Sequence, residues 1–181
     1  MMPHQLNWQE ICQMIPKRKA DAQKGDFGRL LCITGSRNMP GACLLSTQAA
    51  LRGGAGLVTV ATAPENPMRL AAAAPEAMWL PLETDEAGFL RSSDQNRKTL
   101  EKQLSRANAV LLGCGLGVTE ETRRLVHWVL EQAVCPVVLD ADGLNCAVSC
   151  IELSRRTGKD WILTPHPGEM ARLTGRSIPQ I

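Results

Sequence analysis

The sequence predicts a single α/β domain built on a mostly parallel β-sheet. Short apolar runs alternate along the chain with longer helical segments, which is the pattern of strands joined by crossover helices. The apolar runs are continuous rather than alternating, as expected for strands that helices cover on both faces. The 181 residues contain no internal repeat, low-complexity tract or linker. We therefore expect one domain over residues 1–181, with a helical lead-in over residues 1–23.

Each element follows from a local pattern. The expected strands are Arg29–Thr34, Leu57–Thr62, Met78–Leu82, Ala109–Leu112, Pro136–Leu139 and Trp161–Leu163. The expected helices are Pro40–Arg52, Met68–Ala74, Asp94–Arg106, Glu120–Gln132, Gly143–Ser154 and one that carries Met170, Arg172 and Leu173. Pro40 suits the first turn of its helix, and Gly53–Gly56 ends that helix. In the lead-in, Trp8, Ile11 and Ile15 recur at helical spacing.

Composition excludes several classes of protein. Apolar residues make up 44% of the chain and charged residues 21%, which is ordinary for a globular domain. The net charge of +2 is small and the basic residues are scattered, so we expect no nucleic-acid partner. No apolar run reaches the roughly 18 residues of a membrane helix, and the N-terminus is unlike a signal peptide, so we expect no membrane partner. We expect a cytoplasmic protein.

The chain contains seven cysteines, an odd number, and none of them forms a C-x-x-C pair. Most lie within apolar strand or helix patterns. We therefore predict reduced, buried thiols, as is usual in a cytosolic protein.

Residues suited to binding follow four of the expected strands. The loops are Gly35-Ser36 with Gly41-Ala42, Gly113–Gly117, Asp140–Asn145 and His166–Glu169. Open α/β sheets bind their ligands at the carboxyl ends of the strands. The four loops together therefore predict one composite site at that edge.

Two of these loops are rich in glycine. Gly41 and Ala42 open a helix, whose free N–H groups and dipole suit a phosphate, although the glycine could serve only tight packing. Gly113–Gly117 matches neither G-x-G-x-x-G nor a P-loop, so it indicates neither a dinucleotide fingerprint nor a Walker site.

The other two loops carry ionisable side chains. Asp140 and Asp142 are two residues apart, so we expect them to point to opposite sides, one toward solvent or a ligand and the other capping the following helix. His166 lies between two prolines, which hold its backbone rigid. We predict that its ring faces a ligand as a hydrogen-bond donor, the alternative being a purely structural histidine.

Several motifs occur in a fixed order along nearly the whole chain, from Lys24 to Gly175. They are Lys24-Gly25-x-x-Gly28, Gly35-Ser36, Pro40-Gly41-Ala42, Ala49–Val58, Pro75-Glu76, Gly113-x-Gly115-Leu116-Gly117, Asp140-Ala141-Asp142-x-Leu144-Asn145 and Thr164–Glu169. In this order they resemble the ADP/ATP-dependent NAD(P)H-hydrate dehydratases, a carbohydrate-kinase-like family that repairs hydrated NADH and NADPH.

The resemblance implies a ribokinase-like fold and a carbon–oxygen lyase. Members of the family use ATP or ADP with Mg²⁺ to phosphorylate the hydroxyl of the hydrate and then eliminate phosphate. Phosphate leaves readily where hydroxide does not, and positioned donors stabilise the charge on the transferring group. The resemblance also implies a homo-oligomer, and an NAD(P)H-hydrate epimerase acting on the same substrate as a partner.

The same resemblance assigns the site residues. Gly41, Ala42, Gly115 and His166 would contact the hydrated dinucleotide. A supporting polar set would consist of Lys24, Asp140, Asn145 and Glu169. Metal ligands stay unassigned.

The chain also departs from the family. A Lys-Gly-x-x-Thr nucleotide-binding turn and a Gly-Thr-Gly-Asp motif with the catalytic base do not occur in the 181 residues. We therefore expect a chain truncated on its C-terminal side and inactive alone. A non-catalytic nucleotide-binding fragment and a small-molecule kinase of the same fold are the alternatives. Cys114 stands where the family usually has proline, and Thr34 where it usually has glycine.

Overall fold

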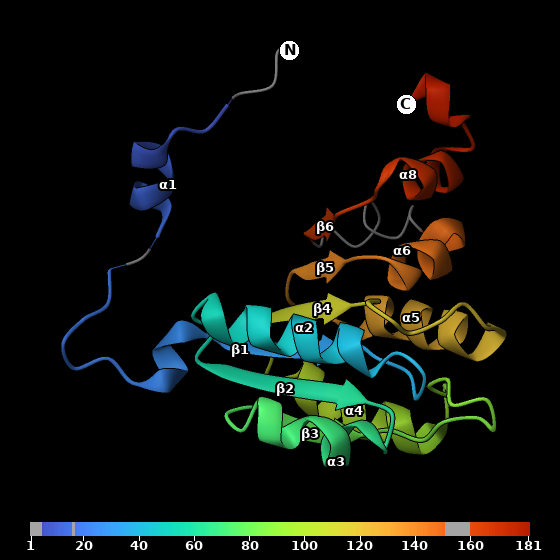
Figure 1. The fold of residues 1–181 in the computed structure, drawn as a ribbon, viewed down its shortest axis with the longest axis horizontal. Coiled ribbons are helices and arrows are strands. Elements are labelled where there is room, and N and C mark those ends of the chain that lie inside the picture. Colours follow the sequence, from blue (N-terminus) through green and yellow to red (C-terminus); the bar gives the residue numbers. More distant parts are fainter. Residues whose placement is uncertain (1–4, 16, 151–159) are drawn as a thin grey trace.

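The computed structural model describes residues 5–15, 17–150 and 160–181, and its centre is one six-stranded sheet (Figure 1). All neighbouring strands run parallel in the order β3-β2-β1-β4-β5-β6. Their bounds are β1 (Arg29–Ile33), β2 (Leu57–Thr62), β3 (Met78–Pro81), β4 (Ala109–Leu112), β5 (Val137–Leu139) and β6 (Trp161–Leu163). The parallel sheet and all six expected strands are confirmed, with ends shifted by at most one residue.

The helices follow the strands as expected. Their bounds are α1 (Trp8–Met14), α2 (Pro40–Arg52), α3 (Asn66–Leu70), α4 (Asp94–Leu104), α5 (Glu120–Gln132), α6 (Asp142–Ala147) and α8 (Pro167–Thr174), with short 3-10 helices η1 (Lys24–Phe27), η2 (Ala71–Ala73), η3 (Val148–Cys150) and η4 (Ile178–Gln180). The ranges of α2 and α5 match the prediction residue for residue. The expected Gly143–Ser154 helix is instead α6 followed by η3 up to Cys150, and its remaining residues lie outside the described part.

Of the expected helical lead-in over residues 1–23, the described residues 5–15 and 17–23 are helical only in α1. Asn7 caps α1 by accepting from the backbone N–H of Glu10 at 3.0 Å, and Glu10 accepts from Asn7 N–H at 2.8 Å. Ile15 is extended, as expected for a residue that precedes a proline. No residue of α1 is buried, and Figure 1 shows this helix away from the sheet.

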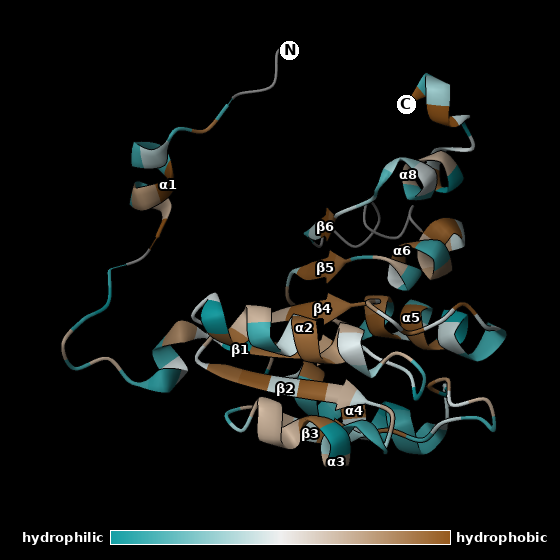
Figure 2. Cartoon of the chain, in the orientation of Figure 1, coloured by the Kyte–Doolittle hydropathy of each residue, from teal (hydrophilic) through white to brown (hydrophobic). Residues whose placement is uncertain are grey.

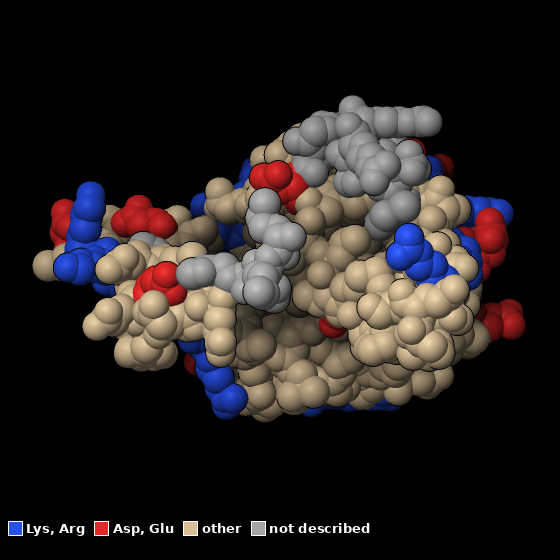
Figure 3. Space-filling view, turned by 90° about the horizontal axis from the view of Figure 1, so that it is seen from above, with Lys and Arg blue, Asp and Glu red and all other residues tan. Residues whose placement is uncertain are grey.

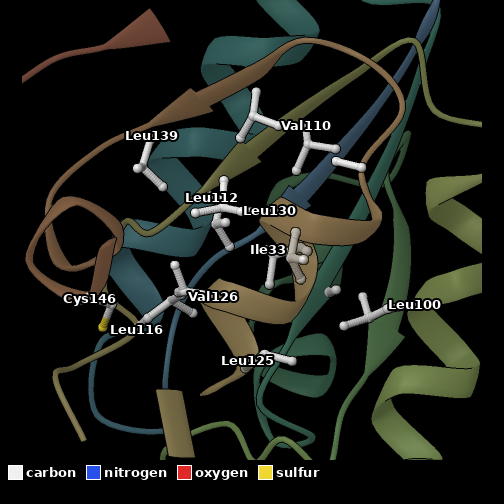
Figure 4. Close-up of a cluster of buried hydrophobic side chains, with 14 of the residues drawn as sticks. Ile33, Leu100, Val110, Leu112, Leu116, Leu125, Val126, Leu130, Leu139 and Cys146 are labelled. Carbon is white, nitrogen blue, oxygen red and sulfur yellow. The ribbon is translucent and has the colours of Figure 1, made fainter. Parts of the chain in front are cut away.

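Helices cover both faces of the sheet. On one face, Ile33, Leu112 and Leu139 pack with Leu125 and Val126 of α5 in the cluster of Figure 4. On the other face, the buried residues come from β1, β2, α2, α3 and the segment after α3, and they are Cys32, Cys43, Val58, Val60, Leu70, Ala74 and Ala77. Figure 2 shows the strands in brown and much of the outer helix surface in teal. Burial on both faces explains the continuous apolar runs.

The surface carries its charges dispersed. In the view of Figure 3, charged side chains lie mostly toward the margin and uncharged residues fill much of the middle.

Within the described ranges, no helix combines the length and the apolar composition needed to cross a bilayer.

None of the seven cysteines forms a disulfide. Four are buried, as predicted, but Cys12 is exposed and Cys114 and Cys135 are half-buried. Burial raises the pKa of Cys32 from 9.0 to about 12, with the neighbouring Cys43 and Cys114 adding to the effect.

Candidate functional site

The loops that follow β1 and β4 are hydrogen-bonded to each other. The N–H of Gly35 donates to the carbonyl of Cys114 at 2.9 Å, and the N–H of Ser36 donates to the carbonyl of Gly115 at 2.7 Å. Because β1 and β4 are neighbours in the parallel sheet, their carboxyl ends lie at one edge. Two of the four predicted loops are thus joined.

Gly115 allows the start of α2 to pack against the loop that follows β4. Its φ is +69°, and a Cβ added there would lie 2.6 Å from Cβ of Ala42 and 3.1 Å from Cβ of Met39. A side chain at this position would therefore push α2 away from the loop. The structure brings together Gly41, Ala42 and Gly115, as predicted.

The first turn of α2 presents unsatisfied donors. Met39 at the N-cap makes no side-chain hydrogen bond, and Pro40 has no N–H. Within the described residues, no acceptor is found for the N–H groups of Gly41 and Ala42. A 13-residue helix also directs the positive end of its dipole there. This turn can bind a phosphate or another anionic group.

A buried polar network holds the first loop from behind. Thr62 donates through its hydroxyl to the carbonyl of Gly35 at 2.9 Å, and Asn66 donates through Nδ2 to the carbonyl of Ser36 at 3.2 Å and to Thr62 Oγ1 at 2.8 Å. Around this loop, the buried side-chain atoms Thr34 Oγ1, Ser36 Oγ and Asn66 Oδ1 find no hydrogen-bond partner among the described residues. A buried, hydrogen-bonded network rigidifies the backbone that it holds.

Neither Thr62 nor Asn66 was predicted as a site residue. Thr62 ends a strand and Asn66 begins a helix, positions where polar residues are common, so no local signal marks them.

Arg37 holds the outer side of the same loop. Its Nε lies 2.7 Å from Oε1 of Glu65, and its Nη1 donates to the carbonyl of Glu86 at 2.9 Å. A backbone hydrogen bond and the contact with Arg37 lower the pKa of Glu65. The loop is therefore fixed from both sides.

A groove runs from the start of α2 to the ends of β5 and β6. Its volume is about 660 Å³, and its lining consists of Leu30, Ala42, Leu45, Ser46, Ala49, Ala50, Leu111, Cys114, Val138, Asp140 and Thr164. Asp140 accepts from the hydroxyl of Thr164 at 2.8 Å, and its other oxygen lies 3.5 Å from Sγ of Cys114. The groove therefore has mostly apolar walls, with the carboxylate of Asp140 in its lining.

Cys114 lies inside this site as a protonated thiol. Burial raises its pKa, the side chain of Ser46 opposes that effect, and the charge of Asp140 reinforces it. A thiol with a raised pKa is a poor nucleophile at neutral pH.

Neither aspartate caps α6, so the capping interpretation is wrong. The N-cap is Ala141, a non-glycine residue with φ of +51°, and it makes no side-chain cap. Asp142 instead accepts from the N–H of Gly117 at 2.8 Å, and Asp140 bonds Thr164. Each carboxylate ties its loop to a loop after a neighbouring strand. Strained backbone such as that of Ala141 often occurs at functional sites.

His166 uses both ring nitrogens within its own helix start. Nδ1 accepts from the N–H of Gly168 at 3.1 Å, so the proton of a neutral ring lies on Nε2, 3.2 Å from Oε1 of Glu169. Glu169 is buried, and its Oε2 accepts from the backbone N–H of His166 at 3.0 Å. In this structure the donor nitrogen faces Glu169 rather than the groove, which corrects the predicted direction. The ring is 62% exposed and accessible to a ligand.

The remaining predicted residues lie in two different places. Asn145 on α6 accepts through Oδ1 from Arg172 of α8 at 2.7 Å, at the same edge as His166. Lys24 belongs to η1, and its backbone carbonyl lies against Gly56, the residue just before β2. Lys24 is therefore at the amino edge of the sheet, and its assignment to the polar site with the other residues is wrong.

The described residues do not form a metal site. They contain no group of three or more His, Cys, Asp or Glu side chains that could hold an ion.

Comparison with known sequences identifies related proteins. Residues 30–180 match the family model described as NAD(P)H-hydrate dehydratase. The bifunctional NAD(P)H-hydrate repair enzyme Nnr of Coxiella burnetii is 39% identical over 97% of this chain and 33% of its own length. The ADP-dependent (S)-NAD(P)H-hydrate dehydratase of Xanthomonas campestris is 38% identical over 84% of this chain and 50% of its own length. The chain thus spans a third to a half of these relatives.

Solved structures share the fold. A ribokinase-like superfamily protein from Enterococcus faecalis superposes with a TM-score of 0.79 at 27% identity, over 97% of this chain and 58% of its own. The ADP/ATP-dependent NAD(P)H-hydrate dehydratase from Bacillus subtilis, co-crystallized with ATP/Mg²⁺, superposes with a TM-score of 0.70 at 30% identity, over 94% of this chain and 56% of its own. The ribokinase-like fold is confirmed.

Proposed function

This chain belongs to the NAD(P)H-hydrate dehydratase family, and we propose from that membership that its protein dehydrates hydrated NADH and NADPH with ADP or ATP. The observation that carries the proposal is the contact between Gly115 and Ala42, which sets free N–H groups of α2 beside a groove. This arrangement suits a ligand that has both phosphates and an uncharged ring. A hydrated dinucleotide has both.

Each part of the site has a distinct role in this proposal. The N–H groups of Gly41 and Ala42 bind a phosphate of the dinucleotide, and Gly115 lets the loop approach it closely. The apolar walls of the groove exclude water, and Asp140, oriented by Thr164, forms a polar end. His166 contacts the substrate from its exposed side.

The nucleotide would supply the phosphoryl group that turns the hydroxyl of the hydrate into a better leaving group. We propose that Mg²⁺ enters with the nucleotide phosphates, because this ion is usually bound by substrate phosphates together with one or two carboxylates. We assign no catalytic base, because the Gly-Thr-Gly-Asp motif of the family does not occur in these 181 residues.

The biological setting is part of the same proposal. We place the chain in one ribokinase-like domain of a cytoplasmic homo-oligomer. An NAD(P)H-hydrate epimerase is the partner that fits, since relatives such as that of Coxiella burnetii are named bifunctional repair enzymes.

Two measurements on the 181-residue chain test the proposal. Calorimetric titration with (S)-NADH-hydrate should give saturable binding, and the return of NADH absorbance with ATP or ADP and Mg²⁺ should show no turnover. No binding would reject the hydrate site. Turnover at the rate of a full-length relative would show that the Lys-Gly-x-x-Thr and Gly-Thr-Gly-Asp motifs are not needed for the reaction. Phosphorylation of a sugar or hydroxymethylpyrimidine would favour the kinase alternative, and binding that persists in a complete but inactive protein would favour a non-catalytic nucleotide binder.

A further inference from the structure

Two arginines from different helices converge on one asparagine. Arg123 of α5 donates through Nη1 to the backbone carbonyl of Asn145 at 3.2 Å. Arg172 of α8 donates through Nη1 to Oδ1 of the same residue at 2.7 Å. Asn145 therefore holds the two guanidinium groups near each other.

Neither guanidinium is neutralised by a carboxylate of the described ranges 5–15, 17–150 and 160–181. By contrast, Arg124, the next residue on α5, pairs with Glu120 at 3.2 Å and with Glu121 at 3.1 Å. A guanidinium has five N–H donors, and Arg123 and Arg172 each use one in the hydrogen bonds found here. The pair thus keeps its charge and most of its donors available.

Both arginines line the same cavity. Its volume is about 450 Å³, and its lining is Val118, Arg123, Asn145, Val148 and Arg172. This volume falls in the range of small-molecule sites. The cavity therefore combines two positive charges, one amide and two apolar side chains.

The cavity lies at the edge of the sheet that carries the hydrate site. Val118 directly follows the Gly113–Gly117 loop. Arg172 folds back toward the start of α8, where its Nη2 lies 4.0 Å from the position of a Cβ on Gly168, two residues after His166. A ligand that reached Gly115 and His166 could extend to the two arginines.

We propose that Arg123 and Arg172 bind a phosphate monoester of a nucleotide and, resting on the proposed function, that this group is the 2′-phosphate of hydrated NADPH. The planar guanidinium fork matches phosphate oxygens and binds them in a bidentate manner. Arginine is also the side chain that accommodates the 2′-phosphate in other dinucleotide sites. The pair would then favour hydrated NADPH over hydrated NADH.

Calorimetry on the 181-residue chain tests this site with 2′-AMP, adenosine and ADP as probes. We expect 2′-AMP to bind, adenosine to bind at least tenfold more weakly, and Arg123→Gln or Arg172→Gln to weaken 2′-AMP binding about tenfold each. Arg124→Gln removes the same charge one residue away and should leave 2′-AMP affinity unchanged. Equal losses in Arg124→Gln, or equal binding of adenosine and 2′-AMP, would overturn the site. The 2′-phosphate assignment would be overturned if ADP bound more tightly than 2′-AMP and if Arg123→Gln and Arg172→Gln each abolished that ADP binding.

Two further measurements keep the outcomes distinct. If Arg172→Gln lowers the melting temperature, the result is decided by Arg123→Gln. The only hydrogen bond found for Arg123 among the described residues goes to a backbone carbonyl. Binding of NADH-hydrate to the unmodified chain tests the proposed function by itself, because that ligand lacks the 2′-phosphate. NADH-hydrate binding without 2′-AMP binding would therefore reject only the arginine site, and the reverse result would reject only the hydrate site.

Discussion

Gly115 and Ala42 are 73 residues apart in the sequence but in direct contact, since a Cβ on Gly115 would lie 2.6 Å from Cβ of Ala42. This contact joins the loop after β4 to the first turn of α2. Backbone hydrogen bonds from Gly35 and Ser36 support the same joint. The geometry of the candidate site therefore depends on a position that has no side chain.

Gly115→Ala should lower the free energy of unfolding by about 2–4 kcal/mol, because it adds left-handed backbone strain to an overpacked contact. Gly41→Ala is the matched control. Gly41 lies in α2 with no atom within 4 Å of an added Cβ, so alanine should be neutral or stabilising by about 0.5–1 kcal/mol. Denaturant unfolding measures both. Similar effects of the two substitutions would contradict the close packing of Gly115 on Ala42.

Ala42→Asp should weaken binding of the hydrate by about 1–3 kcal/mol, because a carboxylate would oppose the phosphate at the start of α2. Gln95→Glu adds the same charge to an exposed position in the first turn of α4 and serves as the control. Calorimetry with (S)-NADH-hydrate gives both affinities. An unchanged affinity of Ala42→Asp for the hydrate would show that no phosphate of the ligand binds at the start of α2.

His166→Ala should lower the free energy of unfolding by about 1 kcal/mol, because the N–H of Gly168 loses its acceptor. Asparagine is a good N-cap, so His166→Asn should keep most of that stability. If the ring also contacts the substrate, both variants should bind the hydrate more weakly. If both variants bound the hydrate with wild-type affinity and only His166→Ala were less stable, the role of His166 would be structural.

The stability of the fold should fall in alkali because of Cys32. Its pKa is about 12 in the folded chain against an ordinary 9.0, so the unfolded chain releases its proton first as the pH rises. The stability from this thiol is complete below pH 9 and is lost between pH 9 and 12, with a slope of at most about 1.4 kcal/mol per pH unit. Urea unfolding from pH 8 to 10.5 should show a shallower decline in Cys32→Ala. Cys12→Ala, on exposed α1, should keep the wild-type slope.

Local pattern was sufficient for most of the fold. The strand β2 and the helices α2 and α5 were predicted residue for residue, because hydrophobic periodicity, Pro40 and the glycines after Arg52 act within a few residues. The start of α3 was missed by two residues, since Asn66 and Pro67 precede its apolar residues and read as a turn.

The candidate site was predicted less completely. The sequence placed Gly41, Ala42, Gly115 and His166 at the carboxyl edge, because strand direction alone decides which loops share an edge. It also grouped Lys24 with them, although η1 lies against the start of β2 at the other edge. Its expectation that one of the two aspartates caps α6 was wrong, since Asp140 bonds Thr164 and Asp142 bonds Gly117.

The sequence by itself determined the alternation of strands and helices, the parallel sheet and the family motifs, all of which depend on short-range spacing. Only the tertiary structure decided that Gly115 packs against Ala42 and that Arg123 and Arg172 meet at Asn145. Arg123 and Arg172 are 49 residues apart, and no periodicity links positions on different helices. Their meeting depends on how α5, α6 and α8 pack around the sheet, which is set by the burial of many apolar side chains together.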